Sequence, residues 1–276
     1  MSPAVHAAAP GAGRPPAEDA GGPPVVLLHA LPFDASMWDG TARELRARGH
    51  RVVAADQPGF GAAPPAQGPP SLDAVADALA AELDRQGIAA AVLAGCSLGG
   101  YTAMAFLRRH PHRVRGLALL AARGTADTAQ AAEQRRRFAD AVLDDEARER
   151  LVAATTPSLL GATTRGRRPD LLGRVTRLAL AAPPQSVAWT QRAVAARPDS
   201  TAVLRAAAVP ALVVIGDEDE LVSPDEARLT AAALPQGRLA ILPGVGHLAP
   251  LEAPRETARL LAGLLARAGK AGAGAW

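Results

Sequence analysis

The feature that most constrains this chain is a serine between two glycines, where an apolar run changes into a helical pattern. Residues 90–96 are typical of a buried strand, and residues 98–109 carry apolar side chains at helical spacing. Between them stands Gly95-Cys96-Ser97-Leu98-Gly99. A serine on so sharp a strand-to-helix turn has a strained backbone, and the glycines avoid a collision. The turn raises the hydroxyl above the C-terminal edge of a sheet. We therefore predict that Ser97 is a nucleophile, with a glycine-rich packing turn as the alternative.

Strand-like and helical stretches alternate on both sides of this turn. Further strands are predicted at 25–28, 51–56, 114–121, 210–215 and 238–242, and helices at 36–48, 71–85, 224–234 and 252–268. This alternation predicts an α/β fold with a mostly parallel sheet flanked by helices. Ligands of such sheets bind at the C-terminal ends of the strands.

The pattern changes in the middle of the chain, where residues 123–204 contain no strand-like run. Helices are predicted there at 128–143, 145–154, 169–182 and 185–196, with proline and glycine between them. We therefore predict a core formed by 25–122 and 205–268, with 123–204 as an all-helical cap.

Both ends of the chain lack the periodicity of a packed element. Residues 1–24 are rich in Pro, Gly and Ala and are expected to form a disordered arm, and 269–276 a disordered tail. The start resembles no secretory signal, and no apolar run is long enough to cross a bilayer. A cytoplasmic protein without a membrane partner is expected.

The charge pattern limits the class of partner. The formal net charge is only +3, and the basic residues, nearly all Arg, are mixed with Asp and Glu without forming a basic tract. A small-molecule substrate is expected rather than nucleic acid. The single cysteine, Cys96, provides neither a disulfide nor a metal cluster, and we interpret it as a small buried filler.

A serine nucleophile needs a base, and two later segments supply a histidine and an acid. His247 stands in a glycine-rich loop after the last predicted strand, whereas most of the other five histidines flank helix ends or lie in the N-terminal arm. Four carboxylates lie in Asp217-Glu218-Asp219-Glu220, after the penultimate strand. Asp219 is the preferred acid, and Asp217 remains the alternative. The order Ser97, Asp219, His247 is the chain order that one known fold uses for such a triad.

Five segments together resemble a known family. They are residues 27–32 with Trp38, 56–61, 95–101, 216–219 and 246–252. The chain is similar to the α/β-hydrolase-fold serine hydrolases with a helical cap, in particular to the 3-oxoadipate enol-lactonase and related carboxylesterases. The resemblance implies that the backbone N–H groups of Leu31 and Leu98 form the oxyanion hole.

Two departures from that family pattern are visible. The common His-Gly of the oxyanion loop is His29-Ala30 here. The family usually has a β-hairpin before Val25, and residues 1–24 show no such strands, so we expect the hairpin to be missing.

These observations predict an enzyme that hydrolyses a small carboxylic ester or lactone through an acyl-enzyme, with neither cofactor nor metal. Serine at position 97 argues against haloalkane dehalogenase and epoxide hydrolase chemistry, which needs a carboxylate nucleophile. Cofactor-free perhydrolysis of the haloperoxidase kind, C–C bond hydrolysis, and a small-molecule receptor with little turnover remain alternatives. The candidates for lining the substrate pocket are His29, Phe33, Tyr101, Arg123 and Trp189.

Overall fold

A computed structural model describes residues 22–273 of the chain. Its centre is a six-stranded parallel sheet in the order β2-β1-β3-β4-β5-β6. The strands are β1 (Val25–Leu28), β2 (Val52–Ala55), β3 (Ala91–Cys96), β4 (Val114–Leu120), β5 (Ala211–Gly216) and β6 (Gly237–Leu242). Every predicted strand is present, with its ends within about one residue of the prediction. The predicted α/β fold is thus confirmed.

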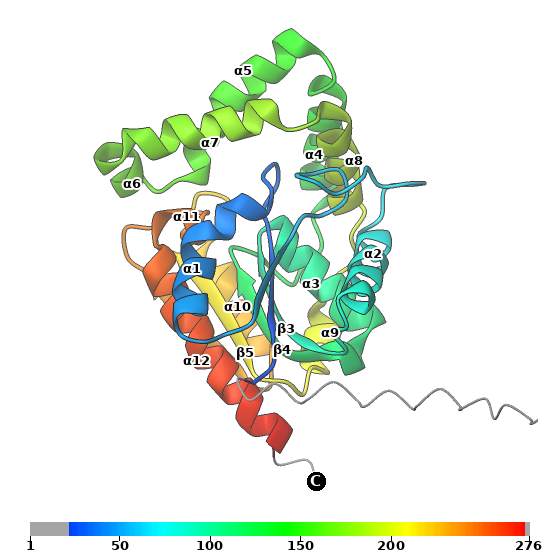
Figure 1. The fold of residues 1–276 in the computed structure, drawn as a ribbon. Coiled ribbons are helices and arrows are strands. Elements are labelled where there is room, and N and C mark those ends of the chain that lie inside the picture. Colours follow the sequence, from blue (N-terminus) through cyan, green and yellow to red (C-terminus); the bar gives the residue numbers. More distant parts are fainter. Residues whose placement is uncertain (1–21, 274–276) are drawn as a thin grey trace, which may run out of the picture.

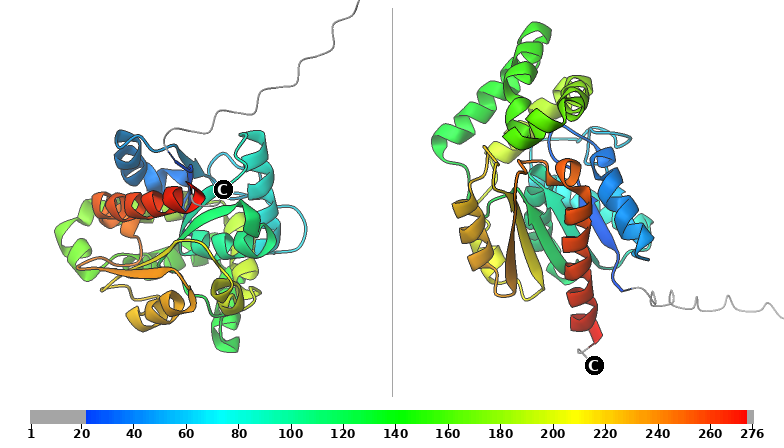
Figure 2. Two further views of the ribbon diagram at one scale, coloured as in Figure 1. Left: turned by 90° about the horizontal axis from the view of Figure 1, so that it is seen from below. Right: turned by 90° about the vertical axis from the view of Figure 1, so that its left-hand side faces the viewer.

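Helices cover both faces of the sheet. The core helices are α1 (Asp39–Ala47), α2 (Leu72–Arg85), α3 (Leu98–Arg109), α9 (Thr201–Arg205), α10 (Pro224–Ala233), α11 (Ala249–Glu252) and α12 (Pro254–Ala273), with 3₁₀ helices η1 (Ala35–Trp38) and η2 (Pro111–Arg113). Helices α1 and α12 pack together on one face, and α2 packs with α3, and α9 with α10, on the other (Figures 1 and 2).

The core is made almost entirely of aliphatic side chains, since only 3% of the residues of the chain are aromatic. Strands β1, β3 and β5 are buried along their whole length, which is expected for parallel strands covered on both faces. Trp38 and Phe106 are the largest of the fully buried side chains.

Between β4 and β5 the described chain forms helices only. The helices α4 (Ala129–Ala141), α5 (Asp145–Thr155), α6 (Ala162–Arg167), α7 (Pro169–Ala181) and α8 (Pro184–Ala195), with the 3₁₀ helix η3 (Pro157–Leu159), are here called the cap helices. They lie beyond the C-terminal ends of the strands (Figure 1). The sequence did not predict α6, α9 or η3, because segments this short show no helical period.

The ends of the chain differ in part from the prediction. Helix α12 continues past Ala268 to Ala273, because Gly269 keeps a helical backbone and two good helix formers, Lys270 and Ala271, follow it. Pro24, assigned to the disordered arm, already accepts a hydrogen bond from Val92 N–H of β3 at 2.9 Å. Residues 1–21, which make up most of the arm where the hairpin is expected to be missing, lie outside the described residues.

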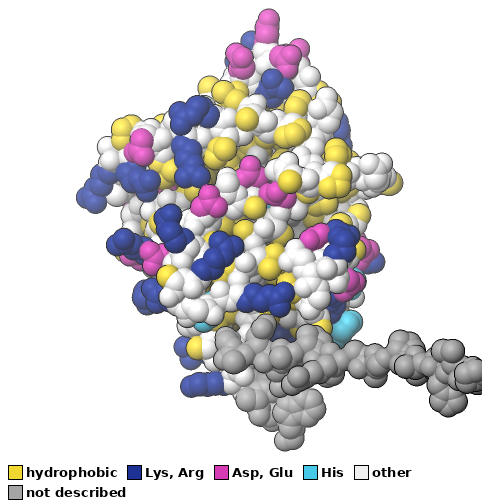
Figure 3. All heavy atoms as spheres, viewed as in Figure 1, with side chains coloured by type: hydrophobic (Ala, Val, Ile, Leu, Met, Phe, Trp, Pro, Cys, Tyr) yellow, Lys and Arg dark blue, Asp and Glu magenta, His cyan; other side chains and the backbone are white. Residues whose placement is uncertain are grey.

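The outer surface mixes the two signs of charge. On the face shown in Figure 3, Lys and Arg side chains lie beside Asp and Glu side chains over most of the surface. None of the helices within residues 22–273 combines the length and the apolar content that a membrane span requires.

Candidate active site

Ser97 occupies the sharp turn that the sequence predicted. Its backbone has φ 50° and ψ −109°, a region that residues other than glycine rarely adopt. The turn is held from both sides, because Ser97 N–H donates to Leu120 O of β4 at 2.8 Å and Ser97 O accepts from Gly100 N–H at 2.9 Å. The strain is thus fixed by the surrounding sheet and helix.

The two glycines of the motif are required by close backbone contacts. A Cβ added to Gly95 would lie 2.1 Å from the carbonyl carbon of Gly99. A Cβ added to Gly99 would lie 2.1 Å from Leu28 O of β1. The predicted collisions are confirmed, and they explain how helix α3 starts so close to the end of β3.

His247 contacts Asp219 at the same end of the sheet. The side chain of His247 is buried, and its Nδ1 lies 2.9 and 3.0 Å from the two carboxylate oxygens of Asp219. A carboxylate can only accept, so the proton of a neutral imidazole is on Nδ1 and Nε2 is free to accept another. Asp219 Oδ1 also accepts from Leu221 N–H and Val222 N–H, at 2.8 and 3.1 Å, which fixes the carboxylate.

The other three acids of this segment bind elsewhere. Asp217, the alternative acid, accepts from Gly244 N–H at 2.7 Å. Glu218 accepts from the hydroxyl of Thr163 at 2.6 Å, and hydrogen bonds from Thr163 lower the pKa of Glu218. Glu220 pairs with Arg165 at 2.9 Å. Each of these three acids therefore ties down a loop or a cap helix.

Glu252 anchors the loop that carries His247, and sequence analysis assigned it no role. Its carboxylate accepts N–H groups on both sides of the histidine, from Gly246 at 3.0 Å and Leu248 at 3.1 Å. It also accepts from Gly161 N–H, just before cap helix α6, at 2.9 Å. The only indication in the sequence is a carboxylate in the short turn of helix that follows the histidine.

A cavity of about 440 Å³ opens between this end of the sheet and the cap helices. Ser97 and His247 both line it, together with Leu31 and Tyr101. Within residues 22–273, the backbone N–H groups of Leu31 and Leu98 donate to no acceptor, and Leu98 is the first residue of helix α3. The sequence-predicted nucleophile, base and oxyanion loop thus come together at one cavity.

Of the five predicted pocket residues, only Tyr101 and Arg123 line this cavity. His29 is fully buried beneath the oxyanion loop, where its Nε2 accepts from Gln57 N–H at 2.9 Å; this burial lowers the pKa of His29. Phe33 is part of the hydrophobic core. Trp189 donates from its ring nitrogen to Gly68 O at 3.0 Å. The structure does not bring these three residues to this cavity, and the sequence does not reveal which way each side chain turns.

Arg123 is already bound by protein carboxylates. Its guanidinium lies 2.7 Å from Asp127 and 3.1 Å from Glu226. Asp127 also pairs with Arg135 and Arg197. Burial disfavours the ionised form of Asp127, but these arginines outweigh it and lower the pKa of Asp127. Arg123 is therefore one member of an ionic cluster rather than a free clamp for a substrate.

Cys96 is buried behind the turn, as predicted. Its thiol donates to the backbone oxygen of His247 at 3.6 Å. Burial raises the pKa of this thiol well above its usual value, which opposes thiolate formation. Ser97, and not Cys96, lines the cavity described above.

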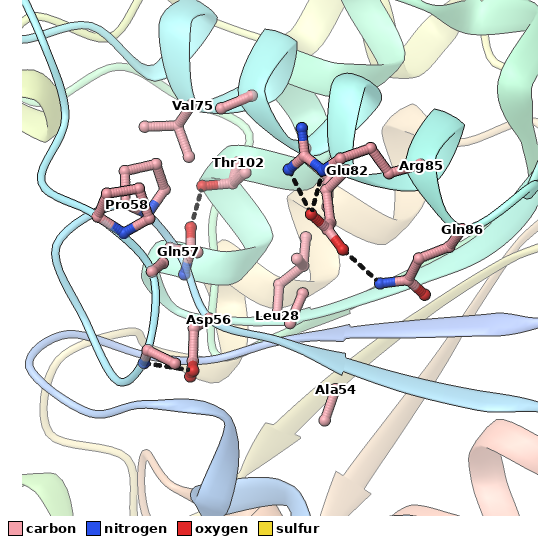
Figure 4. A pocket seen from close by; sticks show the side chains of 16 residues that line it. Leu28, Ala54, Asp56, Gln57, Pro58, Val75, Glu82, Arg85, Gln86 and Thr102 are labelled. Carbon is pink, nitrogen blue, oxygen red and sulfur yellow. Dashed lines mark hydrogen bonds and ion pairs between the residues drawn. The ribbon is translucent and has the colours of Figure 1, made fainter.

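A second cavity, of about 360 Å³, lies beside β2 and α2 (Figure 4). Its polar groups bind one another: Thr102 donates to Gln57 at 2.6 Å, and Glu82 accepts from Gln86 at 2.6 Å and pairs with Arg85. None of its lining residues is Ser97, Asp219 or His247. The candidate active site is therefore the cavity beneath the cap helices, which Ser97 and His247 line.

Comparison with known proteins identifies the family. A family model described as the alpha/beta hydrolase fold matches residues 23–254, so the chain belongs to this family. The predicted resemblance to its esterase and enol-lactonase members is confirmed. The structure is similar to a thermophilic esterase from Thermogutta terrifontis, with a TM-score of 0.86 and 34% identity over 90% of this chain and 91% of that one. It is also similar to the enol-lactonase from Burkholderia xenovorans LB400, with a TM-score of 0.80 and 25% identity over 90% and 94% of the two chains.

Curated sequences give a consistent picture. The chain is 32% identical, over 241 residues, to a pimeloyl-[acyl-carrier protein] methyl ester esterase of Neisseria meningitidis, covering 81% of this chain and 70% of that protein. The chain matches another relative over 243 residues, which is 61% of the length of that relative. It matches three more relatives over shorter stretches, which are 36–40% of the length of each.

Proposed function

We propose that this chain is a serine hydrolase that cleaves a small carboxylic ester or lactone. The observation that carries the proposal is the contact between His247 and the Asp219 carboxylate, with His247 and Ser97 facing one cavity. The names of the relatives support the same class, since they include esterases, a methyl ester esterase and an enol-lactonase. None of these names fixes the substrate of this chain.

The proposed reaction begins with the hydroxyl of Ser97. Its oxygen attacks the carbonyl carbon of the ester while its proton moves to Nε2 of His247. Asp219 accepts the hydrogen bond from Nδ1–H, which keeps Nε2 as the acceptor, and it stabilises the imidazolium that forms. The alcohol then leaves with the proton from His247, and an acyl group remains on Ser97.

The negative charge of the tetrahedral intermediate is proposed to be held by two backbone N–H groups, those of Leu31 and Leu98. Each such donor is worth roughly 3 kcal/mol of transition-state stabilisation. The positive end of helix α3 adds to this field, because the helix begins at Leu98. In the second half of the reaction, water activated by His247 attacks the acyl carbon and releases the acid. A lactone follows the same route, with its alcohol tethered to the acyl group.

The test combines turnover with covalent labelling. Steady-state and burst hydrolysis of short p-nitrophenyl esters are measured for the parent, Ser97→Ala and His247→Ala, with the exposed His112→Ala as a matched control. We expect both site variants to lose about 10³-fold or more in kcat/KM, and the control to retain the parent rate. A fluorophosphonate should add to Ser97, as read by peptide mass spectrometry.

Other outcomes favour the alternatives. One slow turnover with tight binding favours a receptor, and peracid formation from an acyl donor and hydrogen peroxide that outpaces ester hydrolysis favours a perhydrolase. A parent no faster than Ser97→Ala contradicts the proposal.

A further inference from the structure

Arg148 on α5 is a partly buried cation whose buried Nε has no partner among the described residues. Its side chain lines the cavity that also contains Ser97 and His247. Within residues 22–273, its Nε is one of two buried side-chain nitrogen or oxygen atoms with no hydrogen-bond partner, and the other, Trp38 Nε1, does not line this cavity. The Nη2 of Arg148 pairs with Asp145 at 3.1 Å, but Asp145 is 87% exposed, so water screens that pair. Buried N–H groups are nearly always satisfied, which points to an acceptor from outside the chain.

The cavity around Arg148 has an excess of positive charge. Arg123, Arg135 and Arg148 all line it, whereas no carboxylate is among the described residues that do so. The Asp127 carboxylate pairs with three guanidinium groups, those of Arg123, Arg135 and Arg197. The one other carboxylate in this described cluster is Glu226, which pairs with Arg123. The three arginines and two carboxylates give that cluster a net charge of +1. Arg148 brings a further positive charge to the cavity. A cavity so lined favours an anionic ligand.

Much of the lining of the cavity that holds Ser97 and Arg148 is apolar. Phe138, Val142, Val152 and Leu159 contribute to it, which suits a short hydrocarbon chain. The nearby hydroxyls of Thr155 and Thr156 donate to carbonyl groups of their own helix, at 2.7 and 2.6 Å. They therefore do not compete for a ligand as Arg148 does.

We propose that Arg148 binds a carboxylate at the far end of the acyl chain whose ester is attacked by Ser97. The substrate class is then the half-ester of a short dicarboxylic acid, or a lactone that carries a carboxylate. This inference rests on the proposed function and adds its specificity. A carboxylate suits the site because one charged N–H donor and a small excess of positive charge match a monoanion.

The test compares esters that differ only at the far end. Monomethyl esters of dicarboxylic acids with five to eight carbons are compared with methyl alkanoates of the same chain length, by following methanol release. We expect the parent to prefer one of the half-esters. Arg148→Met should lower kcat/KM for that half-ester about 10- to 100-fold, the value of a charge-assisted hydrogen bond, and change the methyl alkanoate by less than about threefold.

The control is Arg150→Met on the same helix, since Arg150 is 71% exposed and pairs with Glu146 on the surface. This variant should match the parent on both substrates. Equal rates of the parent on half-esters and methyl alkanoates would overturn the proposal and leave the ester hydrolase intact. An equal loss of kcat/KM on half-esters and methyl alkanoates in Arg148→Met would also overturn the proposal and leave the ester hydrolase intact.

A binding experiment separates this inference from the proposed function. Calorimetry measures adipate, hexanoate and hexyl phosphate binding to the parent and to Arg148→Met. Tighter binding of adipate than of hexanoate, lost in Arg148→Met, supports the site even if no ester is hydrolysed. Absence of adipate binding, or tighter binding of hexyl phosphate than of adipate, contradicts the carboxylate assignment.

Discussion

Replacing Asp219 by asparagine should reduce turnover sharply while leaving the fold in place. The new amide has the size of the carboxylate, and its oxygen is expected at the position of Oδ1, where Leu221 N–H and Val222 N–H donate. The NH₂ group then occupies the position of Oδ2, 2.9 Å from His247 Nδ1. Two donors now face each other, which favours the tautomer with its proton on Nε2. In that form His247 cannot accept the proton of Ser97.

The magnitude follows from the loss of one charge at short range. A carboxylate 2.9 Å from an imidazolium contributes about 6 kcal/mol at an effective dielectric constant of 20. Each 1.36 kcal/mol is a factor of ten in rate, so kcat should fall by about 10⁴. Because the two backbone hydrogen bonds survive, the free energy of unfolding should change by less than about 1 kcal/mol.

The assay is steady-state hydrolysis of a short p-nitrophenyl ester, with thermal unfolding measured on the same samples. Asp217→Asn is the matched control, because Asp217 is in the same loop and binds Gly244 N–H rather than the histidine. It should lower kcat by less than about tenfold. A large loss in Asp217→Asn with an active Asp219→Asn would refute the assignment of the acid.

Three further perturbations test the framework of the site. In Gly99→Ala, the new Cβ would collide with Leu28 O, so we expect the free energy of unfolding to fall by about 3 kcal/mol or more. The control is Gly263→Ala in α12, where a Cβ has open space. Its free energy of unfolding should rise by about 0.5–1 kcal/mol. In Glu252→Gln, three backbone N–H groups lose their charged acceptor. The free energy of unfolding, measured by thermal unfolding, should fall by about 2 kcal/mol. The kcat should also fall, while circular dichroism shows an unchanged fold. Burial lowers the pKa of His29, so this imidazole binds a proton more readily in the unfolded chain than in the folded one. The free energy of unfolding should therefore fall as the pH drops below about 6.5. His29→Gln should flatten that part of a plot of melting temperature against pH, and an unchanged slope would contradict this.

The parts of the site predicted from sequence are those that local backbone geometry determines. The glycines around Ser97 indicate a sharp turn, because the contact that excludes a Cβ at Gly95 comes from the same turn. The glycines before His247 and the acids after β5 lie just beyond strand ends. Parallel strands bring such ends to one edge, so the sequence was enough to predict that these groups meet.

The parts that were missed depend on contacts between distant segments. His29 ends a strand beside the site, yet Gln57 from the next strand's loop turns its ring into the protein. Trp189 is on a cap helix, and its partner Gly68 is in a loop far away in the sequence. The unpartnered Nε of Arg148 is visible only once the cap helices are packed. A helical pattern in the sequence indicates which face of a helix is apolar, but not which neighbouring segment covers that face.

The contact between Gly161 and Gly246 limits how freely this cap can be exchanged. A Cβ on Gly246 would lie 2.1 Å from Gly161 N, and one on Gly161 would lie 2.9 Å from Gly246 N, so the two backbones touch where the cap helices meet the histidine loop. A cap grafted from another hydrolase would have to bring its own glycine to this point. With any larger residue, the graft would push the histidine away from the serine. Chimeras made to change substrate range should therefore keep this pair of glycines together, and recombination between them should yield folded but inactive proteins.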